Sequence, residues 1–189
     1  MLWYHAFLMR IYIDADSVPK GHREIILRRV LGKDIYTLFA ADRTLGDVTE
    51  PIAKDKALRR KPFRGILPDA EVRKIGSLIE MLVVESGKDS ADNALCERAE
   101  PPALAVTHDI PLASRLLEKG LVVIDDRGGE YTAGTIRERL QERENNRAFR
   151  EMGVFQDKTK SFDRKTVREF ANTFDRCLSK LLSEEKSQA

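Results

Sequence analysis

Short apolar runs alternate along this chain with segments of helical periodicity, and this alternation is the feature that most limits how the chain can fold. The runs are rich in β-branched and aromatic residues, as strands covered on both faces require. The predicted strands span 11–13, 34–40, 80–86, 103–107 and 121–125, and helical patterns at 22–31, 88–99 and 110–120 follow three of them. Strands joined by helical crossovers pair in parallel. The alternation therefore predicts an α/β fold with a mostly parallel sheet of about five strands between helices.

The remaining segments do not follow this pattern. Residues 42–74 lack a clear period, so we expect less regular structure there, and between Lys54 and Lys74 there are eight Lys or Arg residues against three Asp or Glu. After residue 134 no strand signal remains, and helices are expected over 136–152 and 163–184. The second of these helices carries an apolar stripe that should pack on the α/β body: Val167, Phe170, Phe174, Leu178, Leu181 and Leu182.

A chain of 189 residues is long enough for one domain with its own core. We expect residues 1–8 to be an N-terminal extension outside the fold, with Met9 as an alternative start to Met1. The α/β domain covers 9–132, the C-terminal helices cover 133–183 and pack on the same domain, and 184–189 form a frayed tail.

Composition excludes several classes of protein. Cys96 and Cys177 lie far apart in the sequence and lack the spacing of metal ligands, so we expect no disulfide and no zinc site. The three histidines, including His22 and His108, are equally scattered, and we expect those two to be incidental. The N-terminal "MLWYHAFLM" lacks a basic region and a cleavage site and is too short to span a bilayer, so we expect a cytoplasmic protein without a membrane partner.

Aspartates follow several of the predicted strands: Asp14 and Asp16 after the first, Asp89 and Asp92 after the third, Asp109 after the fourth, and Asp125 and Asp126 at the end of the fifth. The carboxyl ends of parallel strands meet at one edge of a sheet, so these side chains should converge there. Asp14 and Asp16 are two residues apart and would share a side of an extended segment. Asp89 and Asp92 would share a face of the following helix.

Such a cluster repels itself, since two unit charges at 4 Å interact by roughly 4 kcal/mol at an effective dielectric near 20. It needs a cation or protons. Ligands that are all oxygen suit Mg²⁺ or Mn²⁺, which can polarise a phosphate and activate a water. Helix capping is the alternative for Asp16, Asp89 and Asp109, each of which precedes a helix, and Asp16 or Ser17 suits the helix that Pro19 begins. Asp14 is the strongest candidate ligand because it ends a buried strand.

Three motifs carry a resemblance to a known family. "IYIDADSVP", "SGKDSADN" and "VTHDIPLASRLLEKG" resemble the D-A-D-x-x-P, G-x-D-x-A-D-D and T-x-D-I-P-L-A-x-x-L-x-x-K-G segments of the YaiI/YqxD family. "DDRGGEYT" and the helix near the C-terminus also match, so the resemblance covers residues 9–182. It departs from the family at Asn93, where a second Asp is frequent.

This family is regarded as PIN-like, which implies a three-layer α/β/α domain with a carboxylate cluster that binds Mg²⁺ or Mn²⁺. Many PIN domains are nucleases. Carried over, Asp14 is the acid of the first strand, Asp89 and Asp92 are the helix acids, Asp109 is the acid after the fourth strand, and Asp16 is an extra acid of the family motif.

We therefore predict a Mg²⁺- or Mn²⁺-dependent phosphodiesterase that acts on RNA or DNA, with RNA or a single-stranded nucleic acid as its partner. Asp14, Asp89, Asp92 and Asp109 would bind the metal directly or through water, and Asp16 would complete the shell or orient the attacking water. The predicted catalytic residues are Asp14, Asp16, Asp92 and Asp109. The predicted substrate contacts are Lys20, Asn93, Thr107 and Arg115.

Two alternatives remain open. The first motif also fits phosphatases of the haloacid-dehalogenase type, in which Asp14 would be a nucleophile. Thr107, Lys119 and Asp125 follow in the order which that family requires, although Lys119 lies only six residues before Asp125. The other alternative is a non-catalytic nucleic-acid-binding or regulatory module, in which the basic residues of 54–74 would contact phosphates unless they form only a solvated surface.

Overall fold

Six strands form one sheet in the order β3-β2-β1-β4-β5-β6. The computed structural model describes residues 9–85, 87, 89–152 and 163–188. The strands are β1 Met9–Asp14, β2 Ile35–Ala41, β3 Ile79–Val83, β4 Ala103–Val106, β5 Val122–Ile124 and β6 Glu130–Tyr131. Neighbouring strands from β3 to β5 pair in parallel, and β6 is antiparallel to β5. The prediction of a mostly parallel sheet is confirmed, and β6 adds a sixth strand that is too short to leave a periodic pattern.

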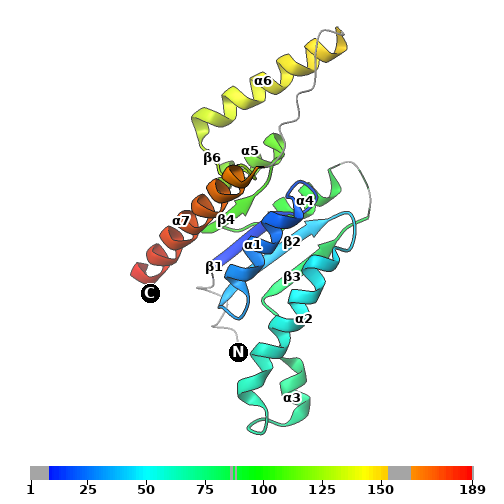
Figure 1. The fold of residues 1–189 in the computed structure, drawn as a ribbon, viewed down its shortest axis with the longest axis vertical. Coiled ribbons are helices and arrows are strands. Elements are labelled where there is room, and N and C mark those ends of the chain that lie inside the picture. The colour runs from blue at the N-terminus through cyan, green and yellow to red at the C-terminus, as the bar shows by residue number, and fades with distance from the viewer. Residues whose placement is uncertain (1–8, 86, 88, 153–162, 189) are drawn as a thin grey trace.

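Helices cover both faces of this sheet (Figure 1). They are α1 Lys20–Val30, α2 Gly46–Arg60, α3 Asp69–Lys74, α4 Ser90–Arg98, α5 Ile110–Glu118, α6 Ala133–Glu151 and α7 Arg164–Gln188, with a 3₁₀ turn, η1, at Lys61–Phe63. The predicted three-layer α/β fold is therefore confirmed. Helix α7 includes most of the segment 184–189 that we expected to be frayed, whereas the predicted extension 1–8 and the segment 153–162 lie outside the described residues.

The prediction that residues 42–74 are less regular is wrong, because α2, η1 and α3 occupy most of this segment. The helical signal of α2 is weak for a physical reason. Only Val48 and Asp55 of this helix are buried, so its apolar stripe is short, and Pro51 lies inside it. Tertiary contacts therefore decide a structure that local propensity does not favour.

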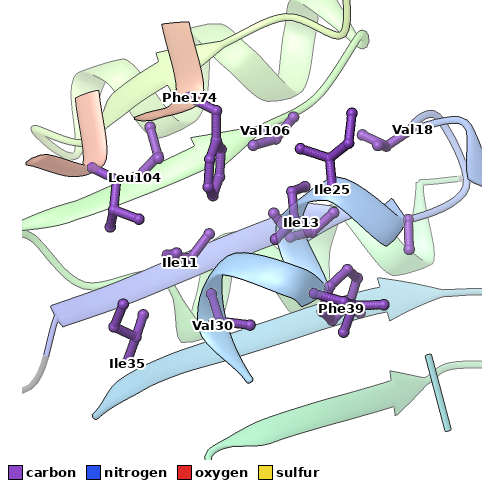
Figure 2. Close-up of a cluster of buried hydrophobic side chains, with 14 of the residues drawn as sticks. Ile11, Ile13, Val18, Ile25, Val30, Ile35, Phe39, Leu104, Val106 and Phe174 are labelled. Atoms are coloured by element: carbon purple, nitrogen blue, oxygen red, sulfur yellow. The ribbon is translucent and has the colours of Figure 1, made fainter. Parts of the chain in front are cut away.

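Alternate residues of the central strand supply two separate cores. Ile11 and Ile13 of β1 point toward α1 and α7, where they pack with Phe170 and Phe174 of α7 (Figure 2). Tyr12 points to the other face, in the core formed with α4, α5 and α6. Full burial of an aromatic side chain such as Phe170 contributes roughly 1.5–3 kcal/mol. The apolar stripe that was predicted for the last helix is therefore its contact with the sheet.

The turn between β5 and β6 approaches the backbone of α7 closely at Gly128. This residue has φ +87°, and an added Cβ would lie 2.7–2.8 Å from backbone atoms of Glu169 and Phe170. We expect Gly128→Ala to lower the free energy of unfolding by about 2 kcal/mol, as measured by urea denaturation, because the new methyl group meets rigid backbone in a strained conformation. The matched change Gly134→Ala, in α6 with no atom closer than 3.9 Å, should be neutral or stabilising. Equal losses in both variants would contradict the close approach as the cause.

In the described part of the chain, no helix is long and apolar enough to cross a membrane. Cys96 and Cys177 are both free and buried.

Candidate functional site

The chain changes direction across the sheet next to β1. It runs from β1 to β2 to β3 on one side and then returns to place β4 on the other side of β1. In sheets of this kind, ligands bind beyond the carboxyl ends of the two strands at such a switch point. The residues that follow β1 and β4 are therefore the first place to look for a site.

Asp14 lies at this point, at the end of β1, and is only 5% exposed. The Thr107 hydroxyl, just after β4, donates a hydrogen bond to Asp14 Oδ2 at 2.7 Å and accepts one from the Asp109 backbone N–H at 2.9 Å. The Ser17 N–H donates to Asp14 Oδ1 at 3.4 Å, and the Ser17 hydroxyl accepts from the His108 N–H at 3.1 Å. These bonds join the loops after β1 and β4 and fix the Asp14 carboxylate. Thr107, which we predicted to contact substrate, is fully buried and orients Asp14 instead.

The pKa of Asp92, in the first turn of α4, reflects the negative charge at this edge of the sheet. This pKa is raised to about 6, first by burial and then by the carboxylates of Asp14, Asp109 and Asp89, while the Arg115 guanidinium opposes the rise. These carboxylates come from three segments of the chain: the end of β1, the start of α4 and the start of α5. The direction of this pKa shift indicates that Asp92 couples electrostatically to the carboxylates of Asp14, Asp89 and Asp109, and their convergence on one ligand stays a prediction.

Helix capping explains the position of one of these acids, Asp109, but not the side chain of Asp89. Asp109 is the N-cap of α5, and its Oδ1 accepts a hydrogen bond from the Leu112 N–H at 2.9 Å. Asp89 occupies the N-cap position of α4, but its side chain makes no capping bond. Its backbone has φ +59° in the left-handed region, which is uncommon for any residue other than glycine. Asp109 therefore has a structural task, and Asp89 has a strained backbone and a carboxylate that capping does not use.

Asp16 lies in the turn that directly follows β1 and not in an extended segment. Its Oδ2 accepts a hydrogen bond from the Asp42 N–H at 2.7 Å, and Arg43 lies 3.1 Å from its Oδ1. Burial raises the pKa of Asp16, and the hydrogen bond from the Asp42 backbone opposes this rise. The prediction that Asp16 or Ser17 caps α1 is wrong, because the N-cap is Pro19 and no side chain bonds there. Asp16 instead ties the end of β1 to the loop after β2.

The side chains at this edge offer carboxylate oxygens, which are the ligand atoms that Mg²⁺ and Mn²⁺ prefer. Within the described residues, however, no group of three or more His, Cys, Asp or Glu side chains has an arrangement that could hold a metal ion. The residues fit a divalent cation by chemistry and charge, but they do not form a complete set of ligands by themselves.

Cations from two helices reach the carboxylates. Arg115 of α5 lowers the pKa of Asp92, and Arg143 of α6 lies 3.7 Å from Asp109 Oδ2. Both side chains can therefore contact an anionic ligand at this edge. Of the other predicted substrate residues, Asn93 is exposed on α4, and Lys20 pairs with Glu24 on α1 at 3.9 Å. Sequence reasoning missed Arg143 because only the packing of α6 against α5 brings it here.

A histidine–carboxylate pair lies beside the switch point, although we expected His108 to be incidental. His108 Nδ1 is 2.8 Å from Asp126 Oδ1. The hydrogen bond to the buried Asp126 raises the pKa of His108, and burial opposes that rise. The imidazole remains 55% exposed. No local pattern predicts this pair, since it forms only when β4 and β5 lie side by side.

Two other residues have structural tasks. Asp125 builds the turn after β5, since its Oδ1 accepts from the N–H groups of Arg127 and Gly129. The Lys119 ammonium donates to the carbonyl oxygens of Cys96 and Ala99 at the end of α4. Lys119 is therefore held at the far end of α5 from the Asp109 cap, where it cannot assist a phosphoryl group on Asp14 as the phosphatase alternative requires.

Comparisons with known proteins agree with the motif resemblance. A family model described as "Uncharacterized BCR, YaiI/YqxD family" matches residues 66–180. A UPF0178 protein of Trichlorobacter lovleyi is 32% identical over 180 residues, which cover 95% of this chain and all of the relative. A UPF0178 protein of Myxococcus xanthus is 32% identical and covers 94% of this chain and 99% of the relative. One from Pseudomonas fluorescens is 32% identical, with 92% and 97% covered. No solved structure matches this chain significantly.

Proposed function

This chain belongs to the YaiI/YqxD family, and from that premise we propose that it is a divalent-metal-dependent phosphodiesterase that acts on RNA or DNA. The observation that carries the proposal is the position of Asp92. Burial, and then the nearby carboxylates of Asp14, Asp109 and Asp89, raise the pKa of Asp92 to about 6, which supports a gathering of acids beside the switch point of the sheet. Carboxylates gathered at the carboxyl edge of a parallel sheet are suited to take up a cation.

The lack of a complete set of metal ligands among the described residues is consistent with Mg²⁺ as the cation. Mg²⁺ keeps several waters and usually binds through one or two carboxylates together with substrate phosphates. Asp14 and Asp92 would supply the direct oxygens, and Asp89 and Asp109 would act through water. When bound, a divalent cation supplies polarisation of the phosphate and an activated water.

The other residues at this edge have separate tasks in the proposal. Arg115 and Arg143 contact the phosphate oxygens, for which the guanidinium geometry is well suited. Thr107 and Ser17 keep the Asp14 carboxylate in one orientation. Asp16 would orient the attacking water, but it contributes less than Asp14 because it lies in the turn beyond the end of β1 and is tied to the loop after β2. None of these groups reads a base, so the proposed substrate is defined by its backbone.

We expect the wild-type protein to cleave a labelled 20-nucleotide single strand of RNA or DNA with Mg²⁺ or Mn²⁺ and not with EDTA. Metal alone should raise the melting temperature by roughly 5–10 °C at a hundredfold excess over the dissociation constant, because only the folded state gathers the carboxylates. Neither cleavage nor metal-dependent stabilisation would contradict the proposal. A phosphomonoester offered in parallel tests the phosphatase alternative, which turnover with an acyl-phosphate on Asp14 would support.

A further inference from the structure

The basic segment between α2 and α3 forms a structured tip on the molecule. Helix α2 starts after the carboxyl end of β2 and runs back along the sheet, so η1 and α3 lie at the edge opposite the carboxylates (Figure 1). The fifteen residues of α2 span about 22 Å. A ligand that touched both ends of the molecule would therefore be extended.

Two arginines of this segment hold the tip in place. Arg60 donates hydrogen bonds to the carbonyl oxygens of Ile75 and Arg73, which close the loop between α2 and α3. Arg59 pairs with the fully buried Asp55 at 2.9 Å and with Asp34 at 3.0 Å. The positive charges of Arg59 and Arg60 are therefore used inside the fold, although the sequence alone presents them as part of a free basic run.

The cations that follow in the sequence are, in contrast, not used inside the fold. Lys61 and Arg64 make no ion pair and no side-chain hydrogen bond with any other residue that the structure describes. Beside them Phe63 is 42% exposed and Ile66 is 75% exposed, and both lie among the few large apolar side chains on the described surface. We call Lys61, Phe63, Arg64 and Ile66 the basic tip. Cations next to an exposed aromatic ring on a braced loop match the requirements for binding a single-stranded nucleic acid, whose phosphates and bases they would contact.

We propose that the basic tip is a second nucleic-acid contact, which holds a strand of RNA or DNA away from the carboxylate edge. The choice of a nucleic acid over other partners rests on the proposed function and on charge complementarity, since Lys61 and Arg64 carry positive charges that no described acidic side chain pairs with. At about 3.4 Å per stacked nucleotide, a strand that spans α2 has roughly seven nucleotides. The preferred ligand is therefore longer than a dinucleotide or a short fragment.

The proposal is tested by measuring nucleic-acid binding under conditions that prevent cleavage. Fluorescence anisotropy in EDTA measures the affinity for labelled single strands of 20 and 4 nucleotides. Lys61→Gln/Arg64→Gln should weaken binding of the 20-mer about five- to tenfold and reduce the salt dependence by one to two phosphates. Phe63→Leu, which keeps an apolar side chain but no aromatic face, should weaken it about fivefold or more. Binding of the 4-mer should not change in either variant.

The matched control removes the same charge elsewhere. Lys165→Gln/Lys180→Gln takes two exposed cations from α7 and should leave the affinity for the 20-mer within twofold of wild type. Equal affinity of the tip variants and wild type, or an equal loss in the control, would overturn the inference. So would sedimentation with anionic phospholipid vesicles that depends on the tip and that the 20-mer does not displace. Because EDTA prevents metal-dependent cleavage, loss of the proposed activity and loss of tip binding are observed separately.

Discussion

Replacing Asp14 by asparagine should lower the rate of metal-dependent cleavage by about 1,000-fold or more, while the protein remains folded. The loss corresponds to about 4 kcal/mol of transition-state stabilisation, which is within the range for a metal-assisted reaction. Asparagine keeps the shape of the side chain and an oxygen for the Thr107 hydroxyl, so the loops after β1 and β4 should stay joined. Single-turnover cleavage of a labelled 20-mer measures the rate, and circular dichroism checks the fold.

Asp16→Asn is the matched control, two residues away. Its side-chain oxygen can still accept from the Asp42 N–H, and the lost ion pair with Arg43 is a surface pair worth about 0–1 kcal/mol. We expect less than a tenfold loss of activity. Equal losses in Asp14→Asn and Asp16→Asn would show that both aspartates act at the phosphate, against the ranking proposed above. An active Asp14→Asn variant would contradict the proposed function itself.

Asp92→Asn should stabilise the protein above pH 6 by about 1–3 kcal/mol, or roughly 3–9 °C in melting temperature. The pKa of Asp92 is about 6 in the folded state against the ordinary 3.8, so the folded state holds its proton more tightly than the unfolded state does. Ionisation of Asp92 therefore costs stability as the pH rises from 4 to 6, and the full cost is present above pH 6. Asparagine is neutral at every pH and avoids that cost.

The gain from Asp92→Asn should disappear near pH 4, where the wild-type carboxyl is also neutral. Melting curves at pH 4, 5, 6 and 8 measure this dependence. Glu97→Gln removes one negative charge from an exposed position on the same helix and should change the melting temperature little at any pH. A gain that is equal at pH 4 and pH 8 would mean that repulsion between the carboxylates is not its cause. Metal ions should stabilise the wild type and not Asp92→Asn.

Much of the fold could be predicted because it follows from local periodicity. Buried strands that alternate with helices require parallel pairing, and parallel strands place the acids that follow them at one edge. Asp14 and Asp92 were therefore expected near one another, although 78 positions apart, and the raised pKa of Asp92 agrees with this. Helix α2 could not be predicted in the same way, since its buried residues are too few to produce a stripe.

The order of the elements and the acids at the strand ends follow from local sequence alone. The partner that each acid faces depends instead on how distant segments pack in the folded chain. Asp16 faces the Asp42 N–H, Asp109 caps α5, and His108 finds Asp126 on a neighbouring strand. The physical reason is that a polar side chain at a strand end takes the direction of its hydrogen-bond partners, and most of these partners come from distant parts of the chain that no local pattern specifies.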